Sequence, residues 1–165
     1  MNRVTLIIVL ILISSCKTSN EKQKNMKIIK SEVTSKNYVE LNADIVWKKL
    51  IVFGGTEKFV PKLIEKVTVK GQGIGAIRDI YLKGGGKIIE ELTKIDNEER
   101  HMEFIILSTP MPITNYTGIF IVNEISNTKC EVKFSSNYTV SSKQKEEMEK
   151  IIKGFQETFL SNLDK

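Results

Sequence analysis

Six strand-like runs follow one another in the middle of the chain, and no helical pattern separates them. Each run is rich in β-branched or aromatic residues, and most are divided by glycine or Asp-Asn turn signals. Strands this close together pair as an antiparallel meander, because a parallel pair needs a crossover of a dozen residues or more. A βαβ fold is therefore excluded. The predicted strands cover residues 63–69, 76–82, 87–95, 101–108, 116–125 and 129–139.

The C-terminal segment, residues 141–163, changes to helical spacing, with apolar residues on one face and lysines and glutamates on the other. Such a helix must bury its apolar face against another element. A further strand at residues 29–41 and a short helix pair at 43–50 and 56–59 precede the meander. The fold class predicted is α+β: a curved antiparallel sheet of about seven strands, wrapped around a long C-terminal helix.

The N-terminus has the pattern of an export signal. Arg3 gives a positive start, residues 4–13 are almost wholly apolar, and small residues precede Cys16. The apolar stretch is shorter than the roughly 20 residues that span a membrane. Ile-Ser-Ser-Cys resembles the lipobox at which bacterial lipoproteins are cleaved and acylated on cysteine. This resemblance implies an exported bacterial lipoprotein, anchored to a cell-envelope membrane through Cys16. An ordinary signal peptide with a chance cysteine is the alternative.

Three segments are expected: a lipoprotein signal peptide at 1–15, the lipidated cysteine with a flexible tether at 16–27, and one domain at 28–165. The chain has a formal net charge of +5, and four lysines against one glutamate place much of it in the tether. Lysines there can bind anionic lipid headgroups, and each contributes about 1 kcal/mol to the binding free energy. The folded part lacks a basic stripe with interleaved aromatic residues, so no nucleic-acid partner is expected.

The supply of cysteine and histidine limits the possible chemistry. The chain has two cysteines and one histidine. With Cys16 lipidated, Cys130 has no partner for an internal disulfide. A metal site built from Cys and His, or a catalytic triad, lacks its residues, so we expect no metal and no cofactor. Alternation along residues 101–108 places His101 on the outer face of the sheet, exposed to solvent.

A run of three glycines at residues 84–86 lies between two predicted strands. A phosphate-binding loop requires a glycine turn that opens a helix, and neither this run nor the glycines at 71–75 do so. In an antiparallel hairpin centred on residue 84, Arg78 lies opposite Glu90. A buried ion pair is costly to desolvate, so a position inside the sheet points to a ligand. A register shifted by one or two residues would instead leave the pair exposed or broken.

The element order resembles the SRPBCC or START-like superfamily of helix-grip proteins, especially its polyketide cyclase/dehydrase and lipid-transport branch. The resemblance runs from about Val33 to Leu163. Its markers are ADIVW at 43–47, GAIR at 75–78 and Asn115-Tyr116. The resemblance implies a cavity between the sheet and the C-terminal helix.

A run of short motifs in the middle of the chain follows one order: Gly75 with Arg78-Asp79, Glu90 with Leu92, Ile95-Asp96, Arg100, Phe104 and Thr114-Asn115-Tyr116. In this order the run is similar to the plant abscisic-acid receptors. In those receptors, the residues that match Glu90, Phe104 and Tyr116 line the ligand cavity, and a mobile gate matches residues 83–87. Here the gate-like loop is shorter and lacks the Ser-Gly-Leu-Pro-Ala signature, and the connection at 108–113 lacks the His-Arg-Leu latch. The resemblance therefore implies a pocket, but neither the hormone nor the signalling partner.

Strand alternation and the resemblance together predict a mostly apolar cavity with a few polar groups, which is typical of a small-molecule site. The alternative is that the aromatic side chains fill this space. The predicted lining consists of Arg78, Ile80, Leu82, Ile88, Glu90, Phe104, Tyr116, Phe134, Tyr138, Ile152, Phe155 and Phe159.

Three functions are compatible with this pattern. The first is a non-enzymatic, membrane-tethered binding protein for a hydrophobic or amphipathic small molecule, lipid- or polyketide-like. The second is a cyclase/dehydratase-type enzyme in which Glu90 is the general base and Arg78 or Tyr116 stabilises an oxyanion. Pairing with arginine lowers the basicity of a carboxylate and argues against it. The third is a structural or interaction lipoprotein with a filled core. No sequence feature indicates an oligomeric state.

Overall fold

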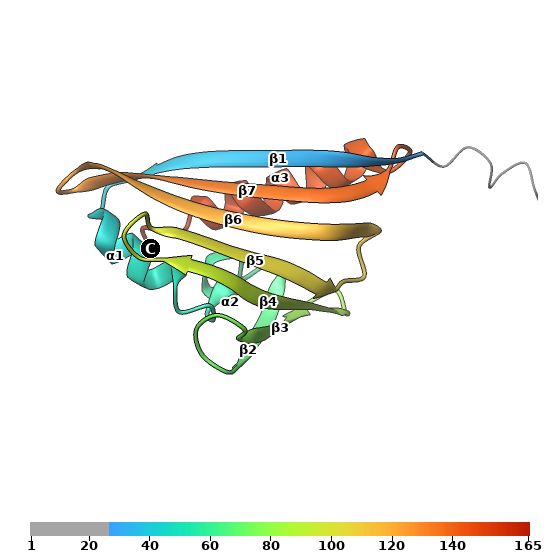
Figure 1. Ribbon diagram of the computed structural model, residues 1–165, viewed down its shortest axis with the longest axis horizontal. Coiled ribbons are helices and arrows are strands. Elements are labelled where there is room, and N and C mark those ends of the chain that lie inside the picture. Colours follow the sequence, from blue (N-terminus) through green and yellow to red (C-terminus); the bar gives the residue numbers. More distant parts are fainter. Residues whose placement is uncertain (1–26) are drawn as a thin grey trace, which may run out of the picture.

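The computed structural model describes residues 27–165, which form a seven-stranded antiparallel sheet curved around a long helix (Figure 1). The predicted fold class is confirmed. The predicted signal peptide, the lipidation site at Cys16 and most of the tether lie outside the described residues. The elements are β1 (Ile28–Val39), α1 (Ala43–Leu50), α2 (Thr56–Phe59), β2 (Ile64–Lys70), β3 (Ile77–Leu82), β4 (Lys87–Asp96), β5 (His101–Ser108), β6 (Ile113–Ser126), β7 (Lys129–Ser141) and α3 (Lys145–Leu160).

The strand order is β1-β7-β6-β5-β4-β3-β2, so consecutive strands from β2 to β7 form the predicted meander. β1 joins the sheet beside β7, and its register brings Ile28 opposite Ser141. α3 lies against β1 and β7 (Figure 1). Two side-chain bonds fix this packing. Gln156 Nε2 donates to the Val33 carbonyl at 3.1 Å, and Asn37 Nδ2 donates to the Leu160 carbonyl at 3.0 Å.

Several predicted boundaries differ from the observed ones: β1 ends at Val39 rather than residue 41, and α3 begins at Lys145 rather than residue 141. Two further differences have identifiable reasons. β6 begins at Ile113 rather than residue 116. The start was missed because the pairing of β6 with β7 is irregular between Thr114 and Thr117. Asn115 has a φ of 51° there, which breaks the alternation that predicts strands. α3 ends at Leu160, although Leu163 beyond it is fully buried. The apolar pattern therefore extends past the hydrogen-bonded helix.

Aromatic rings from β5, β6, β7 and α3 form the centre of the core. The ring centroids of Phe120 and Phe134 lie 4.0 Å apart, and Phe120 lies 5.2 Å from Phe159 on α3. Phe104 lies directly across from Gly118 in the β5–β6 pair. The Phe104 ring occupies the space that a side chain at position 118 would need, since an added Cβ would lie 2.2 Å from its Cζ.

Asn42 caps α1. Its side-chain oxygen accepts a hydrogen bond from the Asp44 backbone N–H at 2.8 Å. We expect Asn42→Ala to lower the free energy of unfolding by about 1 kcal/mol, because one N–H at the helix start loses its acceptor. Urea denaturation measures this change. Asn42→Ser restores an acceptor and should recover most of the loss; equal effects of both substitutions would contradict the capping role.

No helix among residues 27–165 combines the length and apolar character needed to cross a membrane.

Candidate functional site

Arg78 and Glu90 face each other across the β3–β4 hairpin, and the predicted register is confirmed. Arg78 Nε donates to Glu90 Oε2 at 2.5 Å. The two side chains are only 8% and 7% exposed, so the pair lies inside the curved sheet. Both charges are removed from water, which carries a desolvation cost that their mutual attraction offsets only in part.

The residues that follow α1, up to the first residue of α2, contact the Arg78 guanidinium. Nη1 donates to the Phe53 carbonyl at 3.3 Å and to Thr56 Oγ1 at 3.2 Å. The guanidinium carbon also lies 4.2 Å from the Phe53 ring centroid and 4.8 Å from that of Phe104. Cation–π contacts of this kind favour a buried positive charge. Sequence reasoning missed Phe53 and Thr56, because no local pattern links them to Arg78.

Phe53 reaches this position with an unusual backbone conformation. Its φ is 57°, in the left-handed region that a bulky residue seldom adopts. The conformation turns both its carbonyl and its ring toward Arg78.

Burial raises the pKa of the Glu90 carboxyl, and the neighbouring Arg78 charge opposes this rise. From the sequence, the arginine alone was expected to act on Glu90 and to lower the basicity of its carboxylate. Desolvation is the larger effect here, because both charges lie away from solvent. Glu90 is therefore a better proton acceptor than its pairing with Arg78 suggested.

A second polar group lies beside this pair. The Tyr116 hydroxyl and Ser136 Oγ are 2.7 Å apart, and Gln156 Nε2 donates to Ser136 Oγ at 2.9 Å. The three side chains come from β6, β7 and α3, and all are buried. Burial raises the pKa of Tyr116, with a smaller contribution in the same direction from the Glu90 charge. Tyr116 is thus a neutral hydrogen-bonding group at physiological pH.

The raised pKa of Tyr116 gives a testable dependence of stability on pH. A tyrosine whose pKa is raised by folding contributes stability that is lost as the pH rises above its ordinary value of about 10. We therefore expect Tyr116→Phe to lose less stability than the parent protein between about pH 9 and pH 11. Urea denaturation across this range measures the difference. Parallel profiles for the two proteins would contradict the assignment.

A cavity of about 20 Å³ lies among these groups. It has room for about one water molecule, whereas small-molecule pockets measure roughly 300–1,000 Å³. Eight of the predicted residues line it, together with Thr56 and Phe120, which were not predicted. The predicted residues that line it are Arg78, Ile80, Glu90, Phe104, Tyr116, Phe134, Phe155 and Phe159.

Four predicted residues do not line this cavity. Leu82 and Ile88 are only partly buried, near the β3–β4 turn, and Ile152 packs in the core. Tyr138 lies beyond Tyr116, with the two rings stacked at 6.4 Å. Alternation assigns a residue to a face of the sheet, but it does not give the depth along that face.

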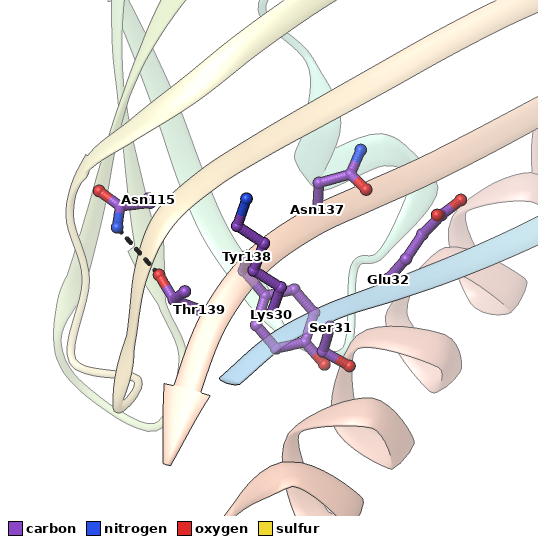
Figure 2. A pocket seen from close by; sticks show the side chains of 7 residues that line it. All are labelled: Lys30, Ser31, Glu32, Asn115, Asn137, Tyr138 and Thr139. Carbon is purple, nitrogen blue, oxygen red and sulfur yellow. Dashed lines mark hydrogen bonds between the residues drawn. The ribbon is translucent and has the colours of Figure 1, made fainter. Parts of the chain in front are cut away.

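A larger open hollow of about 580 Å³ lies near the start of β1. Figure 2 shows its residues, which come from β1, β6 and β7 and include the hydrogen-bonded pair Asn115 and Thr139. Arg78, Glu90 and Tyr116 do not line it. Most of its side chains are exposed or half-buried polar groups. The interior cavity, which holds the perturbed carboxyl and hydroxyl, is therefore the candidate site.

His101 takes no part in this site. It lies on the outer face of β5, as predicted, but its side chain is only 22% exposed. Glu103 lies 2.9 Å from its Nε2, and Lys94 Nζ lies 3.1 Å from its Nδ1, so these neighbours cover it. Within residues 27–165, no group of three acidic, cysteine or histidine side chains is placed to hold a metal ion.

Comparison with known families decides how the chain is classified. Residues 30–165 match the family model for polyketide cyclase / dehydrase and lipid transport. The chain belongs to this family. No curated protein matches the sequence of this cyclase/dehydrase family member.

Solved structures of low sequence identity share the fold of this family member. Zhui aromatase/cyclase from Streptomyces sp. R1128 is 16% identical with a TM-score of 0.71, over 82% of this chain and 92% of its own. Norcoclaurine synthase from Thalictrum flavum, in complex with dopamine and hydroxybenzaldehyde, is 18% identical with a TM-score of 0.68, over 99% and 95%. XoxI from Bacillus cereus is 23% identical with a TM-score of 0.69, over 81% and 93%. At these identities the similarity establishes the fold alone.

Proposed function

We propose that this family member binds a hydrophobic or amphipathic small molecule, lipid- or polyketide-like, between its sheet and α3. One observation carries the proposal: the Arg78–Glu90 pair and Tyr116 converge on one cavity in an interior that is otherwise aromatic. A buried ion pair contributes little net stability compared with apolar residues of similar volume. Its retention in the core therefore favours a role in recognition. The description of the family, which includes lipid transport, supports the same class of ligand.

Binding requires the interior to open, because the cavity holds about 20 Å³. Phe155 on α3 lines the cavity but is only half-buried. Its ring contacts Phe134 edge-on, with centroids 6.2 Å apart. Rotation of this side chain toward solvent enlarges the cavity without moving the sheet, so we propose Phe155 as the side chain that a ligand displaces.

Native mass spectrometry of full-length protein purified from its own host tests the proposal. We expect a bound molecule of lipid-like or polyketide-like mass. Phe155→Trp adds bulk at the cavity and should lower the bound fraction, whereas Ile151→Trp, at a position 46% exposed on the same helix, should leave it unchanged. Protein that carries no ligand in any preparation would favour the third function, a structural lipoprotein with a filled core.

The raised pKa of Glu90 favours one alternative function, the cyclase/dehydratase-type enzyme. In this alternative Glu90 removes a proton from an activated carbon acid, and Tyr116 or Arg78 stabilises the oxyanion. Glu90→Gln distinguishes the two functions once a ligand is known. Loss of turnover with binding intact indicates an enzyme, whereas retained binding of a chemically unchanged ligand indicates a carrier.

We also propose that the protein is exported and tethered to a cell-envelope membrane by lipid on Cys16. The support is the lipobox-like Ile-Ser-Ser-Cys and the lysines that follow it. Multiple acyl chains on one residue would hold the protein stably, since each buried methylene contributes about 0.8 kcal/mol. The intact mass of the mature N-terminus tests this. An unmodified Cys16 on a processed chain would refute the anchor.

A further inference from the structure

We infer that the interior cavity selects a neutral ligand with a carbonyl oxygen, which accepts a hydrogen bond from the Tyr116 hydroxyl. Ligands of the same shape that carry a carboxylate or an ammonium group are rejected. The inference rests on the proposed binding function and specifies the ligand class for that same cavity.

The buried charges of the interior balance each other. Arg78 and Glu90 are the buried charged residues of the part of the chain that the structure describes, and they neutralise each other. Arg78 is also held by the Phe53 carbonyl and the Thr56 hydroxyl. A charged ligand would bring an unpaired charge into a dry interior, or would have to break this pair, and both are costly. A neutral ligand avoids this cost.

The contacts of the Gln156 amide fix its orientation. Its nitrogen lies 3.1 Å from the Val33 carbonyl, which can only accept a hydrogen bond. The opposite orientation would place two oxygens against each other, so the nitrogen must face Val33. The same nitrogen lies 2.9 Å from Ser136 Oγ and donates to it. Ser136 is therefore an acceptor from Gln156, and its own proton is available to another partner.

The direction of the Ser136–Tyr116 bond follows from this. Among residues 27–165, the Tyr116 oxygen is the acceptor within reach of the Ser136 proton, at 2.7 Å. If Tyr116 donated instead, the Ser136 proton would be left without an acceptor at a site with no solvent exposure. With Ser136 as donor, the remaining proton belongs to Tyr116, which lines the cavity. A ligand oxygen can accept it there.

Tyr116 is thus a directed donor in a neutral, aromatic cavity. Burial keeps its hydroxyl protonated, because it raises the pKa of Tyr116. A ketone or aldehyde oxygen supplies the acceptor and brings no charge. An ammonium group has donors and no acceptor, so it cannot accept the Tyr116 proton. The arrangement therefore matches a carbonyl and mismatches both charged alternatives.

Four bicyclic probes of matched size test the inference: naphthalene, 2-acetylnaphthalene, 2-naphthoate and 2-naphthylmethylammonium. Their dissociation constants with the full-length protein are measured by ligand-observed NMR at neutral pH. We expect the ketone to bind about 2- to 10-fold more tightly than naphthalene, as one hydrogen bond allows. The two charged probes should bind at least about 100-fold more weakly than the ketone.

Two variants assign the preference to the Tyr116 proton. Tyr116→Phe removes the donor and should abolish the advantage of the ketone over naphthalene. Gln156→Met removes the donor to Ser136, but the Tyr116 oxygen remains the acceptor for the Ser136 proton, so the ketone should keep its advantage. Tyr138→Phe is the control, because Tyr138 stacks on Tyr116 but does not line the cavity. This control should keep the full ketone advantage.

The outcomes separate this inference from the binding proposal on which it rests. Failure of all four probes to bind would overturn both. Binding of naphthalene without a preference for the ketone would overturn this inference alone. The same conclusion follows if Tyr116→Phe keeps the preference, or if 2-naphthoate or the ammonium probe binds most tightly.

Discussion

Replacement of Glu90 by leucine is expected to lower the free energy of unfolding by about 3–5 kcal/mol, as measured by urea denaturation. The substitution leaves the Arg78 guanidinium buried without its carboxylate partner, which it contacts at 2.5 Å in the parent protein. The Phe53 carbonyl and the Thr56 hydroxyl remain as acceptors. They supply hydrogen bonds but no negative charge, so most of the desolvation cost of Arg78 is not offset.

The double variant Arg78→Met/Glu90→Leu should recover most of this loss, because it removes both charges and retains apolar volume. Lys87→Met is the matched control. It breaks the Lys87–Asp79 pair on the same two strands, where the side chains are 39% and 28% exposed. An exposed pair contributes about 1 kcal/mol or less. Equal destabilisation by Glu90→Leu and Lys87→Met would show that burial of the inner pair carries no special cost.

Gly118→Ala is expected to destabilise the domain by about 3 kcal/mol, through overpacking of the core. An added Cβ would lie 2.2, 2.6 and 2.8 Å from three atoms of the Phe104 ring. The backbone at Gly118 cannot retreat easily, because β6 pairs with Phe104 on one side and with Ser136 on the other. Rings of Phe120 and Phe134 also surround Phe104, so the clash cannot be relieved by a simple rotation.

Two further substitutions examine the cause of this effect. Phe104→Leu in the Gly118→Ala background should restore part of the lost stability, since it removes the ring that the new methyl meets. Gly154→Ala on α3 makes the same chemical change where nothing lies within 4 Å. It should stabilise the protein by up to about 1 kcal/mol, because alanine favours a helix. If both glycine substitutions destabilise the protein, the cause is the lost conformational freedom of glycine rather than a clash with the Phe104 ring.

The sheet could be predicted because the sequence patterns that specify it lie within single strands and turns. Alternation marks each strand, and the glycines at 84–86 fix the centre of one hairpin, from which the Arg78–Glu90 pairing follows by counting. The same counting fails at β6, where Asn115 interrupts the alternation. Register is therefore predictable from a tight turn, but not across a bulge.

The surroundings of Arg78 and the size of the cavity could not be predicted. Phe53 lies 25 residues before Arg78, and their contact depends on a left-handed backbone that no sequence pattern signals. The free volume depends on the rotamers of several aromatic side chains and on the curvature of the sheet. Small changes in either convert a pocket into a packed core, so alternation alone left both possibilities open.

The pairing of β1 with β7 determines when this fold can be completed. Ile28 pairs with Ser141, so β1 and β7 come from opposite ends of the domain. β1 can therefore join the sheet only after almost the whole chain has been synthesised. Contacts between such distant residues slow folding, because the intervening loop must close first. A newly made chain therefore stays open for longer. If the protein is exported, as we propose, that delay would keep the polypeptide in the unfolded state that passage through a membrane requires.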